Sequence, residues 1–200
     1  MSQRWVKLLL GLGNPGWEYQ WTRHNIGFLF IDAIIHKYGL KVETNNAICW
    51  WAKAEIAHQH VILAKPLTYM NLSGQAASWL LSQHSLSPDQ MLIIHDDLDL
   101  PWGRLKLIEK GGSGGHKGVI SIQEMLGTKD IPRLKIGIGR PPAGTDTVSY
   151  VLGDFSPLER EQLNFILEQA IRAVEMALTE GLAKAMSVFN KRNLLEAPSL

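Results

Sequence analysis

The 200-residue sequence contains one cysteine, Cys49, and no apolar run that approaches the length of a membrane span. A single thiol cannot form an internal disulfide and cannot build a thiolate metal site by itself. A helix needs roughly 20 apolar residues to cross a bilayer, and the first residues lack the features of a secretory signal. These absences exclude a disulfide scaffold and a helical membrane protein, so we expect a protein of the reducing cytoplasm.

The sequence also lacks a large charge of either sign, since 20 Lys and Arg against 19 Asp and Glu give a formal net charge of +1. So small a charge argues against a general nucleic-acid coat. The average hides an asymmetry, because residues 104–140 are mainly basic and residues 141–182 mainly acidic. This asymmetry fits a phosphate-contacting face, and it fits a solvated charge mosaic equally well.

No internal repeat, low-complexity block or Pro/Gly/Ser linker divides the sequence. Its 46% of hydrophobic and 20% of charged residues are those of an ordinary globular protein, and its length is enough to bury one large core. We therefore expect a single domain over residues 1–193, followed by a short disordered tail over residues 194–200.

Apolar runs bounded by turn residues alternate with helical patterns along the chain. The runs predict strands over residues 6–10, 48–57, 60–64, 91–94, 105–108 and 134–138. Apolar residues at helical spacing predict helices over residues 26–38, 74–84, 119–126 and from 157 up to Gly181. Strands that alternate with helices form a largely parallel sheet covered on both faces, so the predicted fold class is α/β.

A glycine-rich segment, Gly11-Leu12-Gly13-Asn14-Pro15-Gly16, fits the G-x-G-x-x-G fingerprint of dinucleotide-binding folds and follows a predicted strand. In those folds the helix begins inside the glycine loop, so that its N-terminus meets the pyrophosphate. Here Trp17 and Trp21 extend the loop before any helical pattern, and the acidic residue expected further on, Asp32, lies inside a predicted helix. The sequence therefore argues against a nicotinamide or flavin enzyme.

A second segment, Gly111-Gly112-Ser113-Gly114-Gly115, fits the G-x-S-x-G nucleophile elbow between a strand and a helix. Serine hydrolases of that fold place their histidine after the serine and the acid in the chain. The only histidine after Ser113 is His116, three residues away, so no distant general base remains. A flexible glycine loop is the better interpretation.

Two short clusters leave metal binding open as an alternative. Asp96, Asp97 and Asp99 form one acidic run, and Mg²⁺ favours one or two carboxylates together with phosphate. His58 and His60 could form a metal pair, although histidines beside a strand turn are more often surface residues. A magnesium-dependent phosphatase therefore stays as a competing hypothesis.

Polar residues come just after several predicted strands. Asn14, Asn71 and Asp96 each follow one strand, and the glycine loop over residues 111–118 follows another. In open parallel α/β sheets, ligands bind outside the carboxyl ends of the strands. His24, just before the first predicted helix, can join these residues. The sequence therefore predicts a functional site at this edge of the sheet.

The residues at this edge support a limited chemistry. A histidine with a carboxylate partner can activate water, because the carboxylate fixes the tautomer and stabilises the imidazolium that forms. Asparagine side chains can hold a carbonyl group or donate to a developing oxyanion. This combination favours hydrolysis of an activated ester. If His24 and Asp96 form the pair, we expect the ring within roughly 2.6–3.2 Å of a carboxylate oxygen.

These residues carry a resemblance to the bacterial-type peptidyl-tRNA hydrolase family, over about residues 6–190. The shared motifs, in order, are Gly11-Leu12-Gly13-Asn14-Pro15-Gly16 with Tyr19, Thr22-Arg23-His24-Asn25, Met70-Asn71-Leu72-Ser73-Gly74, His95-Asp96-Asp97-Leu98-Asp99-Leu100-Pro101, Gly114-Gly115-His116, and Arg133-Leu134-Lys135-Ile136-Gly137-Ile138-Gly139. Members of this family are monomeric esterases that recycle tRNA from peptidyl-tRNA.

The resemblance implies one three-layer α/β/α domain with a twisted, mixed, mostly parallel sheet, and an activity that needs no metal or cofactor. It implies that His24 is the catalytic base and that Asp96 is its partner. It also implies a set of substrate-binding residues, namely Asn14, Tyr19, Met70, Asn71, His116 and Lys117. Contacts with phosphates of the tRNA acceptor stem would come from Lys106, Lys110 and Lys135.

Two positions depart from the pattern of the family that this sequence resembles. Most members have asparagine where this chain has Lys117, and a lysine cannot accept a hydrogen bond from water but attracts phosphate. A second basic residue is common where this chain has Ile108, so the phosphate contacts would depend on the remaining lysines. A non-catalytic RNA-binding relative is therefore the alternative from a different class; plant chloroplast splicing factors share this scaffold.

Overall fold

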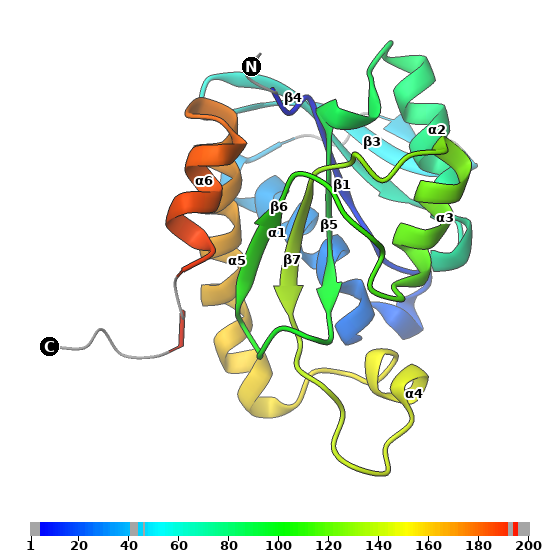
Figure 1. Cartoon of the computed structure of the whole chain (residues 1–200), viewed down its shortest axis with the longest axis vertical. Helices are drawn as coiled ribbons and strands as arrows, with labels where there is room; N and C mark the ends of the chain where they lie inside the picture. Colours follow the sequence, from blue (N-terminus) through cyan, green and yellow to red (C-terminus); the bar gives the residue numbers. More distant parts are fainter. Residues whose placement is uncertain (1–4, 41–43, 46, 192–193, 196–200) are drawn as a thin grey trace, which may run out of the picture.

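In the computed structural model, seven strands form one sheet in the order β2-β3-β4-β1-β5-β7-β6 (Figure 1). The structure describes residues 5–40, 44–45, 47–191 and 194–195. The strands are β1 (Leu8–Gly11), β2 (Thr44–Asn45), β3 (Cys49–Ile56), β4 (Gln59–Pro66), β5 (Met91–Asp97), β6 (Leu105–Ile108) and β7 (Arg133–Gly137). Most of the predicted tail, residues 196–200, lies outside the described residues.

The sheet is mixed, with parallel pairing at its centre. Strand β1 pairs parallel with β4 and β5, and β5 pairs parallel with β7. The pairs β2–β3, β3–β4 and β6–β7 are antiparallel, so only β3 and β6 run against the other five strands. The prediction of a mixed, mostly parallel sheet is confirmed. This arrangement brings the carboxyl ends of β1, β4, β5 and β7 to one edge.

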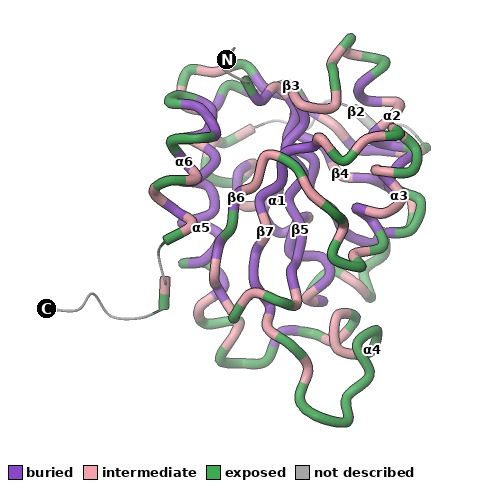
Figure 2. The backbone as a smooth tube through the Cα atoms, viewed as in Figure 1, coloured by how far each residue is buried: buried purple, intermediate pink, exposed green. Residues whose placement is uncertain are grey.

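Helices cover both faces of the sheet, which gives the three predicted layers (Figures 1 and 2). The helices are α1 (Ile26–Tyr38), α2 (Ser73–Gln83), α3 (Lys117–Leu126), α4 (Thr147–Val151), α5 (Pro157–Thr179) and α6 (Leu182–Phe189). One core lies between the sheet and α1, α5 and α6 and includes Leu9, whereas the other lies under α2 and α3 and includes Leu8 and Leu10. Successive strand residues thus enter opposite cores, which explains why β1 is apolar throughout. None of the described helices is both long and apolar enough to cross a membrane.

The predicted elements agree with the structure to within a few residues, and three others were missed. Helix α3 begins two residues before the predicted start, at Lys117, because His116 caps it. Strand β5 continues three residues beyond the predicted end, so Asp96 lies inside the strand and not after it. The two-residue strand β2, the short exposed helix α4 and helix α6 were not predicted. Helix α6 follows Gly181 directly, and Gly181 was taken only as the stop of the preceding helix.

Candidate active site

An open pocket of about 650 Å³ lies at the edge of the sheet where the central parallel strands end. Its walls come from segments that are far apart in the sequence: Asn14, His24, Tyr69, Met70, Asn71, the run from His95 to Asp99, the run from Ser113 to Lys117, Thr147, Val148, Val151 and Leu152. The predicted gathering of polar residues at this edge is therefore confirmed. The reason given for the glycine loop was wrong, because β6 is antiparallel to β7 and its carboxyl end lies at the opposite edge, so the loop must return along the sheet to reach the pocket.

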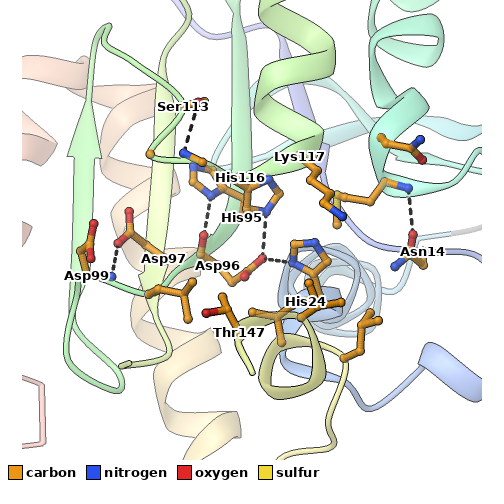
Figure 3. A pocket seen from close by; sticks show the side chains of 18 of the residues that line it. Asn14, His24, His95, Asp96, Asp97, Asp99, Ser113, His116, Lys117 and Thr147 are labelled. Atoms are coloured by element: carbon orange, nitrogen blue, oxygen red, sulfur yellow. Dashed lines mark hydrogen bonds and ion pairs between the residues drawn. The ribbon is translucent and has the colours of Figure 1, made fainter. Parts of the chain in front are cut away.

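His24 and Asp96 meet inside the pocket (Figure 3). His24 lies in the 3₁₀ turn Arg23–Asn25, and its Nδ1 is 2.9 Å from Oδ1 of Asp96 on β5. The two side chains are 10% and 3% exposed, so little water competes for the contact. The predicted distance is confirmed.

The backbone brings His24 this close because α1 begins directly against the sheet. A Cβ added at Gly27 would lie 2.4 Å from the Ile94 carbonyl oxygen and 2.4 Å from the Leu12 nitrogen. Real side chains do not tolerate such distances, so glycine lets the first turn of the helix contact β5. The residues just before it, including His24, are then carried to the strand end that bears Asp96.

A second imidazole, that of His116, contacts the same carboxylate oxygen. His116 Nε2 is 2.9 Å from Asp96 Oδ1, and its Nδ1 accepts a hydrogen bond from the Val119 N–H at the start of α3. Because Nδ1 accepts, the ring hydrogen is on Nε2 and is donated to Asp96. The rings of His24 and His116 lie 4.7 Å apart between centroids. Both nitrogens of His116 are thus engaged within the protein, and its substrate contact stays a prediction.

The Asp96 carboxyl is ionised in this environment. Burial alone raises its pKa, but the neighbouring His24 and His116 imidazoles and their hydrogen bonds outweigh burial and hold the pKa well below its usual range. An ionised carboxylate accepts hydrogen bonds only, so Nδ1 of His24 must carry the hydrogen. The lone pair of His24 is therefore on Nε2 and available as a base.

His95, which was not predicted as a site residue, packs against this cluster. Its Nδ1 donates to the backbone carbonyl of Asp96 at 2.6 Å, and its ring packs 4.6 Å from that of His116. Burial is the largest cause that lowers the pKa of His95 well below its usual value, and the nearby charge of Arg133 adds to it, against the effect of Asp96. His95 is consequently a neutral packing group. Only its position next to Asp96 in the sequence could have indicated it.

Asn14 is held in place by a residue that the sequence analysis did not select, Asn25. The Asn14 N–H donates to Asn25 Oδ1 at 2.8 Å, and Asn25 Nδ2 donates back to the Asn14 carbonyl. Asn14 Oδ1 accepts from the Met70 N–H at 2.8 Å. Because the side-chain oxygen is occupied, the group that Asn14 offers to a ligand is its Nδ2 donor.

The other predicted substrate contacts divide into two groups. Met70 and Asn71 line the pocket from the 3₁₀ turn Met70–Leu72, where Met70 is buried and Asn71 is exposed. Lys117 lines it from the first residue of α3 (Figure 3). Tyr19 does not line this pocket; it lies in the turn Trp17–Tyr19, where its carbonyl accepts a hydrogen bond from Thr22.

The predicted phosphate-binding lysines do not line the pocket either. Lys106 on β6 is exposed and directly opposite Lys135 on β7, and Lys110 is exposed after β6. Lys135 forms an ion pair with Asp97, which lines the pocket. Asp99 pairs with a cation too, Arg140. Two of the three acids proposed for magnesium are thus already neutralised by basic side chains.

Arg23, which precedes His24, binds the segment around α4 that forms one wall of the pocket. Its guanidinium forms two hydrogen bonds with Glu159, at 2.7 and 3.1 Å, and donates to the carbonyls of Tyr150 and Gly153 at 3.3 Å. It also stacks 4.4 Å from the centroid of the Tyr150 ring. Arg23 therefore ties the turn that holds His24 to the segment that closes one side of the pocket.

Comparisons with known proteins agree with this geometry. A sequence model of the family described as "Peptidyl-tRNA hydrolase" matches residues 8–197. The chain is 46% identical to the peptidyl-tRNA hydrolase of Aquifex aeolicus, over 95% of this chain and 99% of that protein. It is 43% identical to the chloroplastic peptidyl-tRNA hydrolase of Arabidopsis thaliana, over 94% of this chain and 66% of that protein. The crystal structure of peptidyl-tRNA hydrolase from Acinetobacter baumannii superposes with a TM-score of 0.89 at 32% identity, covering 97% of this chain and 99% of that one.

Proposed function

This chain belongs to the peptidyl-tRNA hydrolase family and is a hydrolase of peptidyl-tRNA, and we propose that His24 is the base that activates the attacking water. The observation that carries this proposal is the 2.9 Å contact between His24 Nδ1 and Asp96 Oδ1 inside an open pocket. This contact leaves Nε2 of His24 free to accept a proton. Both nitrogens of His116 have partners within the protein, and the unpartnered Nε2 of His95 is buried.

The reaction follows from these roles. His24 Nε2 takes a proton from water as the oxygen attacks the carbonyl carbon of the ester between peptide and tRNA. The C–O bond to the ribose then breaks and the proton on His24 passes to the leaving ribose oxygen. The products are a tRNA hydroxyl and a peptide carboxylic acid, which releases its remaining proton to solvent as a carboxylate. The ionised Asp96 stabilises the imidazolium that exists between these steps.

The asparagines supply the remaining polar contacts of this proposal. Asn14 Nδ2 and the exposed Asn71 amide can bind the peptide main chain and the scissile carbonyl, whose oxygen becomes negative during the attack. We propose that the amide of the last residue is bound in the same pocket. A free ammonium in its place would leave a buried polar group unpaired, which disfavours aminoacyl-tRNA.

The test of this function is a comparison of substrates with metal-depleted protein. We expect release of tRNA from N-acetyl-aminoacyl-tRNA in the presence of a chelator, and slower release by orders of magnitude from the same aminoacyl-tRNA without the acetyl group. Loss of activity with chelator would favour the magnesium-dependent alternative. Binding of tRNA with no turnover would favour the non-catalytic RNA-binding alternative.

We propose further that the acceptor stem of tRNA lies over β6 and β7, and that the protein acts as a monomer in the cytoplasm. Lys106 and Lys110 are exposed there, and Lys135 lies opposite Lys106 in the register. Lys117 at the pocket adds a cation closer to the ester. The pairing of Lys106 with Lys135 across β6 and β7, more than the net charge, supports a phosphate-binding surface.

Salt dependence tests this surface. Each lysine that neutralises a phosphate adds about one unit to the slope of log affinity against log salt. We therefore expect Lys106→Ala and Lys110→Ala each to weaken tRNA binding and to reduce the slope by roughly one unit. Lys53→Ala is the matched control, since Lys53 is exposed on β3 at the other side of the sheet. Slopes equal to that of the wild type in the first two variants would exclude the surface.

A further inference from the structure

Three metal-ligand atoms converge at the centre of the pocket. One ring nitrogen of His24, one of His116 and a carboxylate oxygen of Asp96 all lie within 4.8 Å of one another, and within the described part of the chain no other group of three or more His, Cys, Asp or Glu does so. We infer that this cluster is also a binding site for a divalent transition-metal ion such as Zn²⁺, and that the bound ion inhibits the hydrolase.

The donor set suits that class of ion. Two imidazole nitrogens and one carboxylate oxygen, with a fourth position left open, are typical of zinc bound in an enzyme pocket. Mg²⁺ requires octahedral coordination dominated by oxygen, and this cluster offers one carboxylate, since Asp97 and Asp99 are paired with Lys135 and Arg140. The cluster should therefore select Zn²⁺ or Co²⁺ over Mg²⁺.

Binding of an ion requires the three ligand atoms to rearrange. Each histidine nitrogen is 2.9 Å from Asp96 Oδ1, whereas a tetrahedral ion with bonds of about 2.0–2.2 Å separates its ligand atoms by roughly 3.3–3.6 Å. Each nitrogen must therefore move by about half an ångström away from that oxygen, and any two ligand atoms as far apart as 4.8 Å must also approach to roughly 3.3–3.6 Å. All three side chains line the open pocket and point toward one another (Figure 3), so the ion has an entry path and water can fill the fourth position.

The positions of the ring hydrogens explain why such an ion would inhibit. Both nitrogens that it would occupy now carry hydrogens donated to Asp96, so a metal ion replaces two hydrogen bonds. When the ion takes Nδ1 of His24, the neutral ring keeps its hydrogen on Nε2 and cannot accept a proton from water. This inhibition depends on the proposed role of His24, whereas the binding of the ion does not.

Calorimetric titration of Zn²⁺ into the intact, chelator-treated and dialysed protein tests the binding. We expect one Zn²⁺ per chain, unaffected by millimolar Mg²⁺, and affinity more than roughly tenfold weaker in His116→Ala and His116→Gln. The matched control is His58→Ala/His60→Ala, which removes two exposed histidines outside the pocket and should bind as the wild type does. Thermal unfolding of each variant without metal shows whether it is folded.

The visible absorption of Co²⁺ provides a second readout that does not depend on catalysis. A four-coordinate spectrum is expected with the wild type and the control variant, and its loss is expected in His116→Gln. Absence of one-to-one binding to the wild type, or equal affinity in wild type and both His116 variants, would overturn the site and leave the hydrolase proposal intact. Zn²⁺ bound at the site with undiminished turnover of peptidyl-tRNA would overturn the inhibition.

Discussion

Replacing His24 by alanine should lower kcat/KM for peptidyl-tRNA by about 10²–10⁴-fold, which is the usual contribution of a general base. The loss should appear in kcat, because in the proposed mechanism His24 acts on the attacking water and not on substrate binding. The substitution removes the contact between His24 and Asp96. The neighbouring residues Arg23 and Asn25 keep their own hydrogen bonds, so the pocket should otherwise keep its shape. Initial rates over a range of substrate concentrations measure both constants.

His36→Ala is the matched control for this variant. His36 lies in the last turn of α1, the helix that begins after His24, and it does not line the pocket. We expect its kcat to be that of the wild type. A His24→Ala enzyme that hydrolyses peptidyl-tRNA as fast as the His36→Ala enzyme would remove His24 from the mechanism.

The second large effect is expected from Asp96→Asn. Both imidazole hydrogens are donated to Oδ1, and an asparagine with its oxygen at that position can still accept both. The substitution therefore removes the negative charge and keeps the geometry, so the imidazolium of His24 loses its counter-ion. We expect kcat to fall by roughly 10²–10⁴-fold. The kcat of the Asp96→Ala enzyme should fall at least as far, because alanine leaves the N–H groups of both imidazole rings unpaired.

A double-mutant cycle shows whether the two residues act as one unit. If Asp96 acts through His24, the His24→Ala/Asp96→Asn enzyme should be no more than a few-fold slower than His24→Ala alone, because the effects of a catalytic unit are not additive. The measurement is single-turnover hydrolysis by all four proteins. Losses that multiply in the double variant would mean that Asp96 contributes separately, for example through substrate binding.

The sequence predicted most of the fold because apolar runs and glycine stops mark buried strands and their ends. It missed α4, which is short and exposed, and α6, which begins directly after Gly181, a glycine that the sequence pattern indicated only as the stop of the preceding helix. It also placed Asp96 beyond its strand, since the polar residues at the end of β5 do not look like strand residues. Their pairing with β7, which extends the strand, depends on contacts between distant segments.

Most of the residues of the candidate site were also predicted from the sequence. The alternation of strands and helices gathered Asn14, Asn71 and Asp96, because the carboxyl ends of parallel strands share one edge, and His24 was expected to join them from the start of the first helix. Supporting residues such as Arg23, Asn25 and His95 were not predicted, since their partners are known only from the folded chain. The same limit applies to Tyr19, which the resemblance placed in the site and the structure places outside the pocket.

The central claim is that Asp96 holds His24 with its hydrogen on Nδ1 and its lone pair on Nε2. Nitrogen NMR of the imidazole rings, in the protein labelled with ¹⁵N at histidine, measures this directly. The structure predicts opposite neutral tautomers for two neighbouring rings, with the hydrogen on Nδ1 in His24 and on Nε2 in His116. A neutral His24 with its hydrogen on Nε2 would contradict the account.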